Sequence, residues 1–214
     1  MTLVFTYYDN PLMLSKQIEE WKHYPEEVKI ILVDDGSPNY PAESRLLDSL
    51  TIYRINEDIY QNTFGARNLG FEKAELGWVF NLDLDTVVPA TSIERLLKKD
   101  LNPQFFYRVN RYKMLNMEGR FSLMNQHSDT YLMTKSMYWA LGGYNERLTG
   151  YKNGAAFKFK QQMKTKRSRL LEGIWTEWYG SDLIADASPI NKRDMEPGMR
   201  SGNKTLNFTY EQVI

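Results

Sequence analysis

The sequence has no cysteine among its 214 residues, and this absence excludes disulfide bonds and thiolate metal sites. It also has no excess of either charge, because 27 Lys and Arg residues balance 27 Asp and Glu residues. Without a net charge, the chain has no global field that attracts nucleic acid or an anionic membrane. We therefore expect no nucleic-acid partner, and the missing cysteine suits a reducing, cytoplasmic location.

Long apolar runs are absent as well. No stretch approaches the roughly 18 consecutive apolar residues that a membrane-spanning helix needs. The start, Met1–Phe5, lacks the basic and apolar regions of a signal peptide. We expect no transmembrane segment and no secretory signal. The length suits one domain, residues 1–214, with a sizeable core.

Short apolar runs alternate with helical patterns along the first half of the chain. Strands are predicted at residues 3–6, 28–33, 51–55 and 78–82, and helices at residues 11–21, 42–50, 63–74 and 92–99. Asn10 is the expected cap of the first helix, because Pro11 suits the first helical position. The alternation predicts an α/β fold in which helices cover both faces of a mostly parallel central sheet.

The second half of the chain is less regular. Strands are predicted at residues 104–112, 119–124 and 131–133, the first two antiparallel, and helices at residues 136–141 and 155–166. From Ser181 the chain becomes polar and contains Pro189 and Pro197. This composition predicts a loop-rich C-terminal tail, residues 181–214.

Two acidic pairs follow apolar runs that are predicted strands. Asp34 and Asp35 come directly after one run, and Asp83 and Asp85 come at the end of another. Carboxylates at such places are costly unless they meet a cation or a hydrogen-bonding ligand, although Asp is also common in solvated turns. Mg²⁺ typically takes one or two carboxylates plus substrate phosphates.

The predicted sheet would bring these acids together. In mostly parallel sheets, ligands bind beyond the carboxyl ends of the strands. Both acidic pairs fall at such ends, and so do Tyr7 and Tyr8. This convergence predicts a binding site at one edge of the sheet.

An ordered set of motifs now resembles a known family. The motifs are Thr6–Pro11, Val33–Ser37, Gly65–Gly70, Leu82–Asp85 and Gly142–Glu146, the last followed by Gly150 and Tyr151. In this order and spacing they resemble family 2 glycosyltransferases of the GT-A fold, over about residues 3–160. The Asp-Asp-Gly-Ser and Arg-Asn-x-Gly motifs are specific in combination, and each is weak alone.

The resemblance implies a hexosyltransferase-type enzyme that moves a sugar from a nucleoside-diphosphate donor, expected to be UDP-linked, to a hydroxyl acceptor such as a glycan. It implies that the nucleotide is held by Thr6, Tyr7, Asp34, Asp35, Arg67 and Asp83. Asp85, with Asp83, would hold Mn²⁺ or Mg²⁺ against the diphosphate as a Lewis acid. Residues of about 1–100 would form the nucleotide-binding half, and residues of about 101–180 a smaller, antiparallel acceptor-side half.

The side chains fit these roles but also have ordinary alternatives. A carboxylate suits the imide N–H of uracil, and the Tyr7 ring offers a stacking face, yet tyrosines often pack in the core. The Arg67 fork suits phosphate, yet an arginine on a helix surface commonly forms a salt bridge. Trp175, Trp178 and Tyr179 are acceptor-site candidates or core residues, and His127 is more often structural than a metal ligand.

One departure from the family pattern concerns the general base. Inverting members carry an acid soon after the Gly142–Glu146 motif, but this chain has no carboxylate between Glu146 and Glu172. Ala155 or Ala156 stands about where the acid belongs. A general base contributes about 10²–10⁴-fold to the rate.

Three explanations for the missing acid stay open. Another carboxylate, Glu146, Asp182 or Asp129, serves as the base; or the enzyme retains the anomeric configuration; or the chain binds a nucleotide sugar without efficient transfer. A sugar-nucleotide pyrophosphorylase is a further alternative, but its Gly-rich phosphate loop has no counterpart in Tyr7–Pro11.

Overall fold

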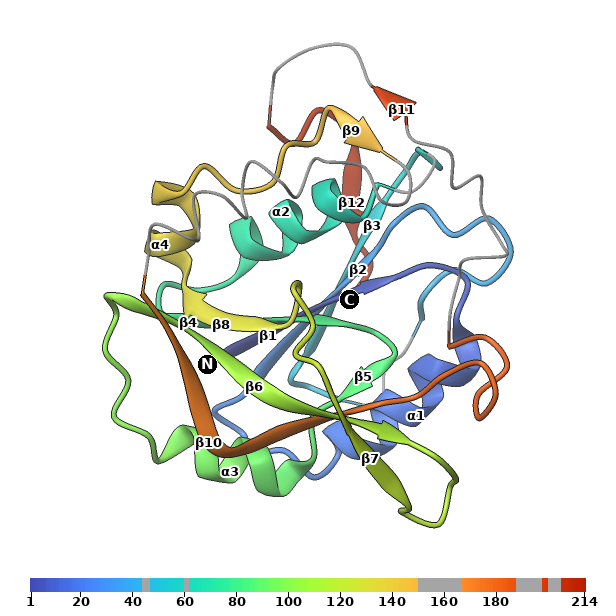
Figure 1. Cartoon of the computed structure of the whole chain (residues 1–214). Coiled ribbons are helices and arrows are strands. Elements are labelled where there is room, and N and C mark those ends of the chain that lie inside the picture. The colour runs from blue at the N-terminus through green and yellow to red at the C-terminus, as the bar shows by residue number, and fades with distance from the viewer. Residues whose placement is uncertain (44–46, 60–61, 150–166, 188–197, 200–204) are drawn as a thin grey trace.

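The computed structural model of the chain describes residues 1–43, 47–59, 62–149, 167–187, 198–199 and 205–214. One large sheet crosses the molecule, and helices pack against it on two sides (Figure 1). Its strands are β1 (Thr2–Tyr7), β2 (Lys29–Asp34), β3 (Leu50–Ile55), β4 (Trp78–Asp83), β5 (Thr86–Val87), β6 (Phe105–Met114), β7 (Phe121–Met124), β8 (Tyr131–Thr134), β10 (Arg167–Trp178) and β12 (Tyr210–Gln212). The helices are α1 (Pro11–Trp21), α2 (Thr63–Lys73), α3 (Ala90–Leu97) and α4 (Lys135–Ala140), and two short strands, β9 (Leu148–Thr149) and β11 (Gly198–Met199), pair with each other.

The sheet has a parallel half and a mixed half. β3, β2, β1 and β4 lie side by side and run parallel. β8 then pairs antiparallel with β4 and with β6, and β10 pairs parallel with β6. This is the α/β architecture that the sequence predicts, and each antiparallel pair includes at least one strand from the second half of the chain or its end.

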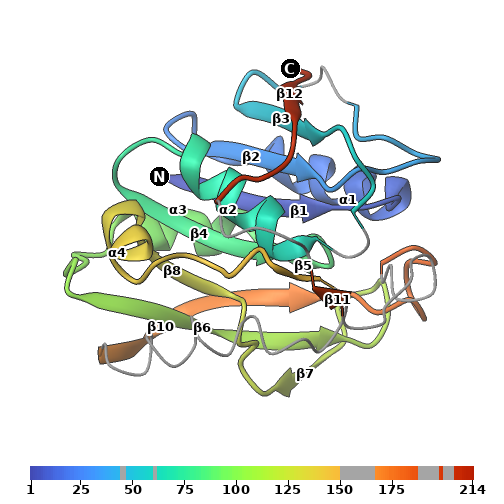
Figure 2. The ribbon, with the colours of Figure 1, turned by 90° about the horizontal axis from the view of Figure 1, so that it is seen from above.

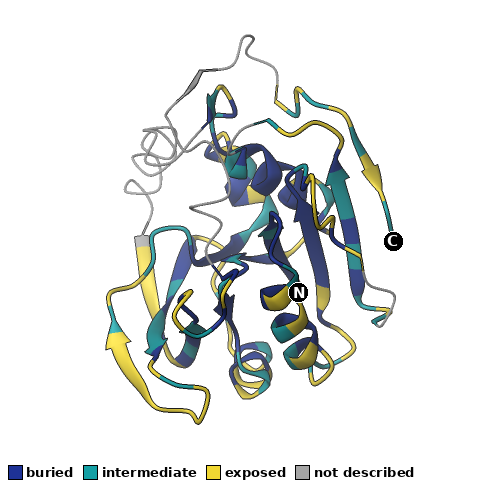
Figure 3. Cartoon of the chain, turned by 90° about the vertical axis from the view of Figure 1, so that its right-hand side faces the viewer, coloured by how far each residue is buried: buried dark blue, intermediate teal, exposed yellow. Residues whose placement is uncertain are grey.

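The two faces of the sheet carry separate hydrophobic cores. Leu3 and Phe5 of β1 pack on the side of α1 and α3, whereas Val4 packs on the side of α2 and α4. Successive strand residues point to opposite faces, so a strand buried on both sides is apolar throughout. Figure 2 shows the helices on either side of the sheet, and Figure 3 shows that buried residues fill the central strands. Helices therefore cover both faces, as predicted.

Helix α1 begins at Pro11 with Asn10 as its N-cap residue, as predicted, but the side chain that caps its amides comes from elsewhere in the chain. The Asn10 side chain makes no capping bond, and its Nδ2 donates instead to the Asp186 backbone oxygen. The Asp186 carboxylate accepts from the amides of Leu12 (2.8 Å) and Met13 (3.0 Å). A residue from far along the chain thus satisfies the first amides of the helix.

In the part of the chain that the structure describes, no helix has the length and apolarity to cross a membrane.

Several predicted elements differ from the structure. The helix predicted at 42–50 is absent from its described residues, and β3 begins at Leu50, within that range. The helix predicted at 155–166 lies outside the described residues. Neither β10 nor β12 was expected. β12 lies in the predicted loop-rich tail and pairs antiparallel with β3, so this part of the tail extends the sheet.

Helix α2 packs very closely on β1 at Gly70. A Cβ placed on Gly70 would lie 2.3 Å from Cγ1 of Val4, which is fully buried. Real Cβ atoms do not approach that closely, so only glycine allows α2 to lie where it does. Because Arg67 sits one turn earlier on α2, this approach also sets where that side chain reaches.

We predict that Gly70→Ala destabilises the fold. In an exposed helix this change adds up to about 1 kcal/mol of stability, but here overpacking should cost about 1–3 kcal/mol. Urea unfolding of the wild type, Gly70→Ala, Val4→Ala and the double variant measures the coupling. We expect the double variant to lose less free energy of unfolding than the two single variants lose in sum, because Val4→Ala removes the methyl groups that the added Cβ would meet. Strictly additive effects would show that the Val4 contact does not limit this position.

Candidate functional site

The carboxyl ends of β1, β2 and β4 meet at one edge of the sheet. The register places Thr6 beside Asp83, and Tyr7 beside Asp34. Asp34 in turn lies beside Arg54 of β3. The convergence predicted from the two acidic pairs is therefore present in the fold.

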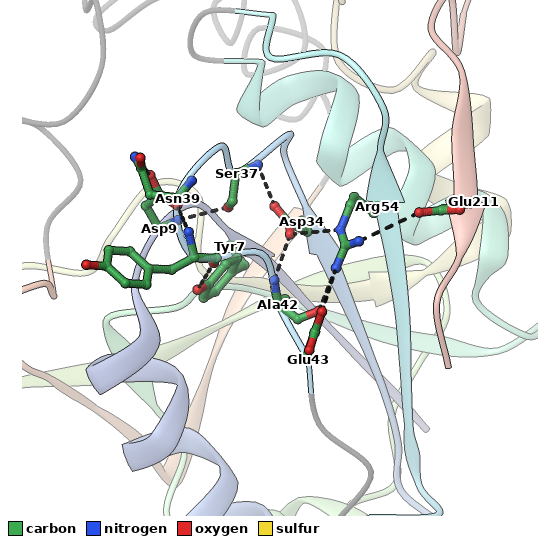
Figure 4. Close-up of polar contacts among 10 residues, drawn as sticks. Tyr7, Asp9, Asp34, Ser37, Asn39, Ala42, Glu43, Arg54 and Glu211 are labelled. Carbon is green, nitrogen blue, oxygen red and sulfur yellow. Dashed lines mark hydrogen bonds and ion pairs between the residues drawn. The ribbon is translucent and has the colours of Figure 1, made fainter.

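The Asp34 carboxylate organises the loop that follows β2. Asp34 is fully buried, and its two oxygens accept from the amides of Ser37 (2.9 Å) and Ala42 (2.8 Å) and from Nε of Arg54 (3.4 Å), as Figure 4 shows. These bonds fix residues 34–42 against β3. Asp34 therefore holds the loop in place. Asp35, the other acid of the motif, is buried as well. Direct contact of either acid with a base stays a prediction.

A second acid joins this loop to the end of β1. Asp9 accepts from the backbone amide of Tyr40 (2.7 Å) and from the Asn39 side chain (2.8 Å), and its own amide donates to Ser37 (2.9 Å). The Tyr7 hydroxyl donates to the Tyr40 carbonyl. The Tyr7 ring is 2% exposed and lies in the core on the α1 side, so it does not present the stacking face expected from the sequence.

Asp83 lies between an arginine and a histidine. One oxygen pairs with the Arg67 guanidinium, and the other lies 3.1 Å from Nδ1 of His127. Burial disfavours the charged acid, but Arg67 and His127 outweigh it and hold the pKa of Asp83 well below its usual value. For His127, burial works against the charged form, but the hydrogen bond and charge of Asp83 raise its pKa.

Arg67 is buried, so it is not the helix-surface arginine that was the alternative to a phosphate contact. Its side chain is 4% exposed, and besides Asp83 it lies 3.7 Å from Asp129. The Tyr144 hydroxyl donates to Asp129 (3.0 Å), and the guanidinium lies over the Tyr144 ring at 5.4 Å. The structure thus brings two of the predicted residues, Arg67 and Asp83, together with the candidate base Asp129.

Asp85 faces a different set of partners. Its Oδ2 accepts from the Trp178 indole N–H (2.8 Å), and its backbone oxygen accepts from the Tyr179 amide (2.9 Å). Burial and the neighbouring Asp83 charge raise the pKa of Asp85 to about 6, although Trp178 and Arg111 act in the opposite direction. Unlike Asp83, Asp85 has no close ion pair among the described residues.

Two cations of β6 lie against the Trp178 ring, whose indole bonds Asp85. The Arg111 guanidinium lies 5.2 Å from the ring centroid, and the Lys113 ammonium lies 5.4 Å from it. Nε of Arg111 is buried and makes no hydrogen bond within the described ranges. Neither cation was predicted from the sequence, and nor was the strand β10 that carries Trp178. The run Ile174–Trp178, rich in aromatic and β-branched residues, was the available signal for that strand.

The other two candidate bases lie in different surroundings. Glu146 is buried, and its oxygens accept from the Asn68 side chain (2.6 Å) and the Leu206 amide (2.8 Å). Asp182 is 60% exposed and lies 3.7 Å from Lys113. Asp182 is therefore the most accessible of the three, and it lies on the Trp178 side of the site.

The two acids of the Asp-x-Asp motif should change stability in opposite directions at neutral pH. Asp83 has a lower pKa folded than unfolded, so its charge stabilises the fold until the pH falls through the folded-state pKa. Asp85 has a higher pKa folded, so its stabilising contribution is complete below about pH 4 and is lost as the pH rises through about 6. At pH 7.5, Asp83→Asn should lower the free energy of unfolding by about 1–3 kcal/mol, and Asp85→Asn should raise it by about 1–2 kcal/mol.

Urea unfolding in metal-free buffer at pH 7.5 and pH 4 measures both effects. The gain from Asp85→Asn should shrink toward zero at the lower pH. Effects of the same sign at pH 7.5, or a gain independent of pH, would contradict the electrostatic picture.

Solved structures share this fold. S. aureus TarS 1-349 in complex with UDP matches with a TM-score of 0.61 at 13% identity, over 84% of this chain and 60% of that one. The mannosyltransferase PcManGT from Pyrobaculum calidifontis, in complex with GDP-Man and Mn²⁺, matches with a TM-score of 0.60 at 14% identity, over 82% and 55%. GalNAc-T7 with UDP, GalNAc and Mn²⁺ gives 0.56 at 12%, over 84% and 43%.

These neighbours are glycosyltransferases of the GT-A fold, and this chain has the same fold. It spans less than two thirds of the length of each of them. No curated protein matches the chain in sequence. The family model described as Glycosyl transferase family 2 matches residues 2–166, most of the chain. The chain therefore belongs to glycosyl transferase family 2.

Proposed function

We propose that this protein transfers a sugar from a nucleoside-diphosphate donor, UDP-linked, to a hydroxyl acceptor, with Mn²⁺ or Mg²⁺ at Asp85. The observation that carries the proposal is the asymmetry of the Asp83–Asp85 pair. Asp83 already pairs with Arg67 and contacts His127, whereas Asp85 has a raised pKa and no close ion pair among the described residues. A carboxylate in that position is suited to a cation that arrives with the donor.

The residues present fit a divalent metal that the substrate helps to bind. In the part of the chain that the structure describes, no three acids or histidines gather into a complete metal site. Mg²⁺ sites of nucleotide enzymes often use one or two carboxylates and take their other ligands from phosphates and water. Asp85 and Asp83 supply such a partial set, and the bound metal would neutralise charge on the leaving diphosphate.

The neighbouring cations complete the donor side. Arg111 has a buried, unsatisfied Nε among the described residues and lies near the Trp178 ring, which donates to Asp85. A guanidinium fork suits phosphate oxygens. We assign Arg111 to the diphosphate, and Arg67 to positioning Asp83, because Arg67 is bound to that acid and buried. Thr6 and Asp35 remain the residues assigned to the nucleoside.

Asp182 is our choice for the general base. It is the exposed carboxylate on the Trp178 side of the site, whereas Asp129 accepts from Tyr144 and Glu146 holds Asn68 and Leu206. A base must reach the acceptor hydroxyl, and an acid held by buried hydrogen bonds cannot move to do so without breaking them. Asp182, paired only loosely with Lys113 at 3.7 Å, has that freedom.

Metal-dependent nucleotide binding is the direct test. Calorimetry should show that UDP binds at least about tenfold more tightly with Mn²⁺ than in EDTA, a difference of about 1.4 kcal/mol. Asp85→Asn should abolish the Mn²⁺ effect while the protein stays folded, and Asp182→Asn should keep it. Among UDP, GDP, CDP and dTDP, UDP should bind most tightly. Equal UDP affinity with and without Mn²⁺ would sink the metal assignment, and preference for another base would remove the uridine assignment.

Loss of the proposed base should affect turnover only. With an acceptor found by screening UDP-sugars against an oligosaccharide panel, Asp182→Asn should lower the transfer kcat by about 10²–10⁴-fold and leave UDP affinity unchanged. Glu172→Gln, an exposed acid of β10, is the matched control. If Asp182→Asn transfers normally, the assignment of Asp182 is wrong, and the anomeric configuration of the product separates the two remaining explanations. Inversion would direct the search to Asp129 and Glu146, and retention would mean that no such base is needed.

A further inference from the structure

A cavity of about 430 Å³ lies against the β6–β7–β10 part of the sheet. It is lined by Asn110, Tyr112, Phe121, Gly173, Ile174, Trp175 and Glu177. None of these residues belongs to the donor site. The size falls within the range of small-molecule sites, about 300–1,000 Å³.

An irregularity in β10 lies at this cavity, and its residues Gly173–Trp175 form part of the lining. The pairing of β10 with β6 advances from Leu170↔Arg108 to Trp175↔Asn110, so five steps on β10 match two steps on β6. The extra residues form a bulge with Gly173 at a φ of +76°, a conformation that favours glycine. Bulges of this kind re-aim side chains and are common beside functional sites.

The register separates the cavity from the donor side of the same strands. Paired strand residues share a face and successive residues alternate. Trp175 pairs with Asn110, and Glu177 pairs with Tyr112, so these four share the cavity face. Their neighbour Trp178 points to the other face, where its indole donates to Asp85.

Three aromatic rings shape the cavity. The Tyr112 and Phe121 rings lie 5.0 Å apart at 66° and form a corner. The Arg95 guanidinium lies 5.4 Å from the centroid of the Trp175 ring, and it also donates to the Gly173 carbonyl, which supports the bulge. Phe121 is 58% exposed, so its ring is open to a ligand from solvent.

The polar lining narrows the class of ligand. Its polar side chains are an amide, Asn110, a carboxylate, Glu177, and the Tyr112 hydroxyl, and it includes no lysine or arginine. One Glu177 oxygen also accepts from the Tyr179 hydroxyl (3.3 Å), which leaves the other oxygen for a ligand. A carboxylate without a lining cation repels phosphates and other anions. Amide and carboxylate groups instead match hydroxyls, which donate and accept. A pyranose ring combines an apolar C–H face with a hydroxyl edge, and it matches both halves of this lining.

We propose that this cavity binds a neutral pyranose unit of an oligosaccharide, as a saccharide site separate from the donor site. Trp175 and the Tyr112–Phe121 corner would pack on the C–H faces of the sugar. Asn110 and Glu177 would bond its hydroxyls. The site would hold a longer glycan at a second point, away from the sugar transfer.

Calorimetry with cellotetraose, chitotetraose, maltotetraose and α-linked mannotetraose tests the proposal on the full chain. We expect at least one of them to bind with a Kd of about 1 mM or tighter. Phe121→Ala, at an exposed ring, and the isosteric Glu177→Gln should each weaken that binding at least about tenfold. Leu123→Ala is the matched control, because Leu123 is 67% exposed on the same strand but does not line the cavity.

UDP affinity with Mn²⁺, measured on the same variants, separates this site from the donor site. It should be unchanged in Phe121→Ala and Glu177→Gln. Binding of none of the four saccharides, or binding that all three variants retain, would overturn the proposal. A parallel loss of UDP affinity would also overturn it, because the cavity would then belong to the donor site. Saccharide binding that survives in a protein without metal-dependent UDP binding would uphold this site and reject the proposed donor function.

Discussion

The buried Arg67 guanidinium is the charge on which the site depends. It enters from α2, pairs with Asp83 at the end of β4, and lies beside Asp129 before β8. A buried cation without such partners would be strongly destabilising. The fold is therefore stable only when α2, the end of β4 and the segment before β8 come together around Arg67. The close packing of Gly70 on Val4 sets the depth at which α2 carries this charge. The order of the parallel strands then puts Asp85 and the β2 loop around the same edge.

This arrangement gives the two acids of one short motif different characters. Asp83 is committed to the protein, because Arg67 pairs with it and His127 contacts it. Asp85 is held in place by an indole N–H, a partner that orients the carboxylate without cancelling its charge. One acid thus maintains the framework, and the other carries a charge that no close ion pair among the described residues cancels. The aromatic strand β10 is central to this division, since it supplies Trp178 on one face and the walls of a cavity on the other.

Sequence patterns within a few neighbouring residues predicted the helix bounds and strand ends that depend on those residues alone. The Asn-Pro start and the apolar period of α1 indicated its bounds from Pro11 to Trp21, and the acidic pairs marked strand ends that do meet. Contacts between residues that are far apart in the sequence could not be predicted in this way. Asp186 caps α1 from the far end of the chain, and the Asp83–His127 contact joins residues that no spacing rule connects. Tyr7 shows a third limit, because a tyrosine at a strand end suits a nucleobase or the core equally well, and only packing decides between them.

The last described strand has a consequence for how the chain folds. β12 pairs with β3 through Tyr210 and Ile55, which are 155 positions apart (210 − 55), and Glu211 lies 3.7 Å from the same Arg54 that bonds Asp34. During synthesis, β3 therefore keeps an open hydrogen-bonding edge until Tyr210–Gln212 have left the ribosome. Such long-range pairings form slowly, and open strand edges are templates for association with other chains. Until β12 pairs, the strand beside the Asp34 loop therefore offers an open edge at which association with other chains competes with folding.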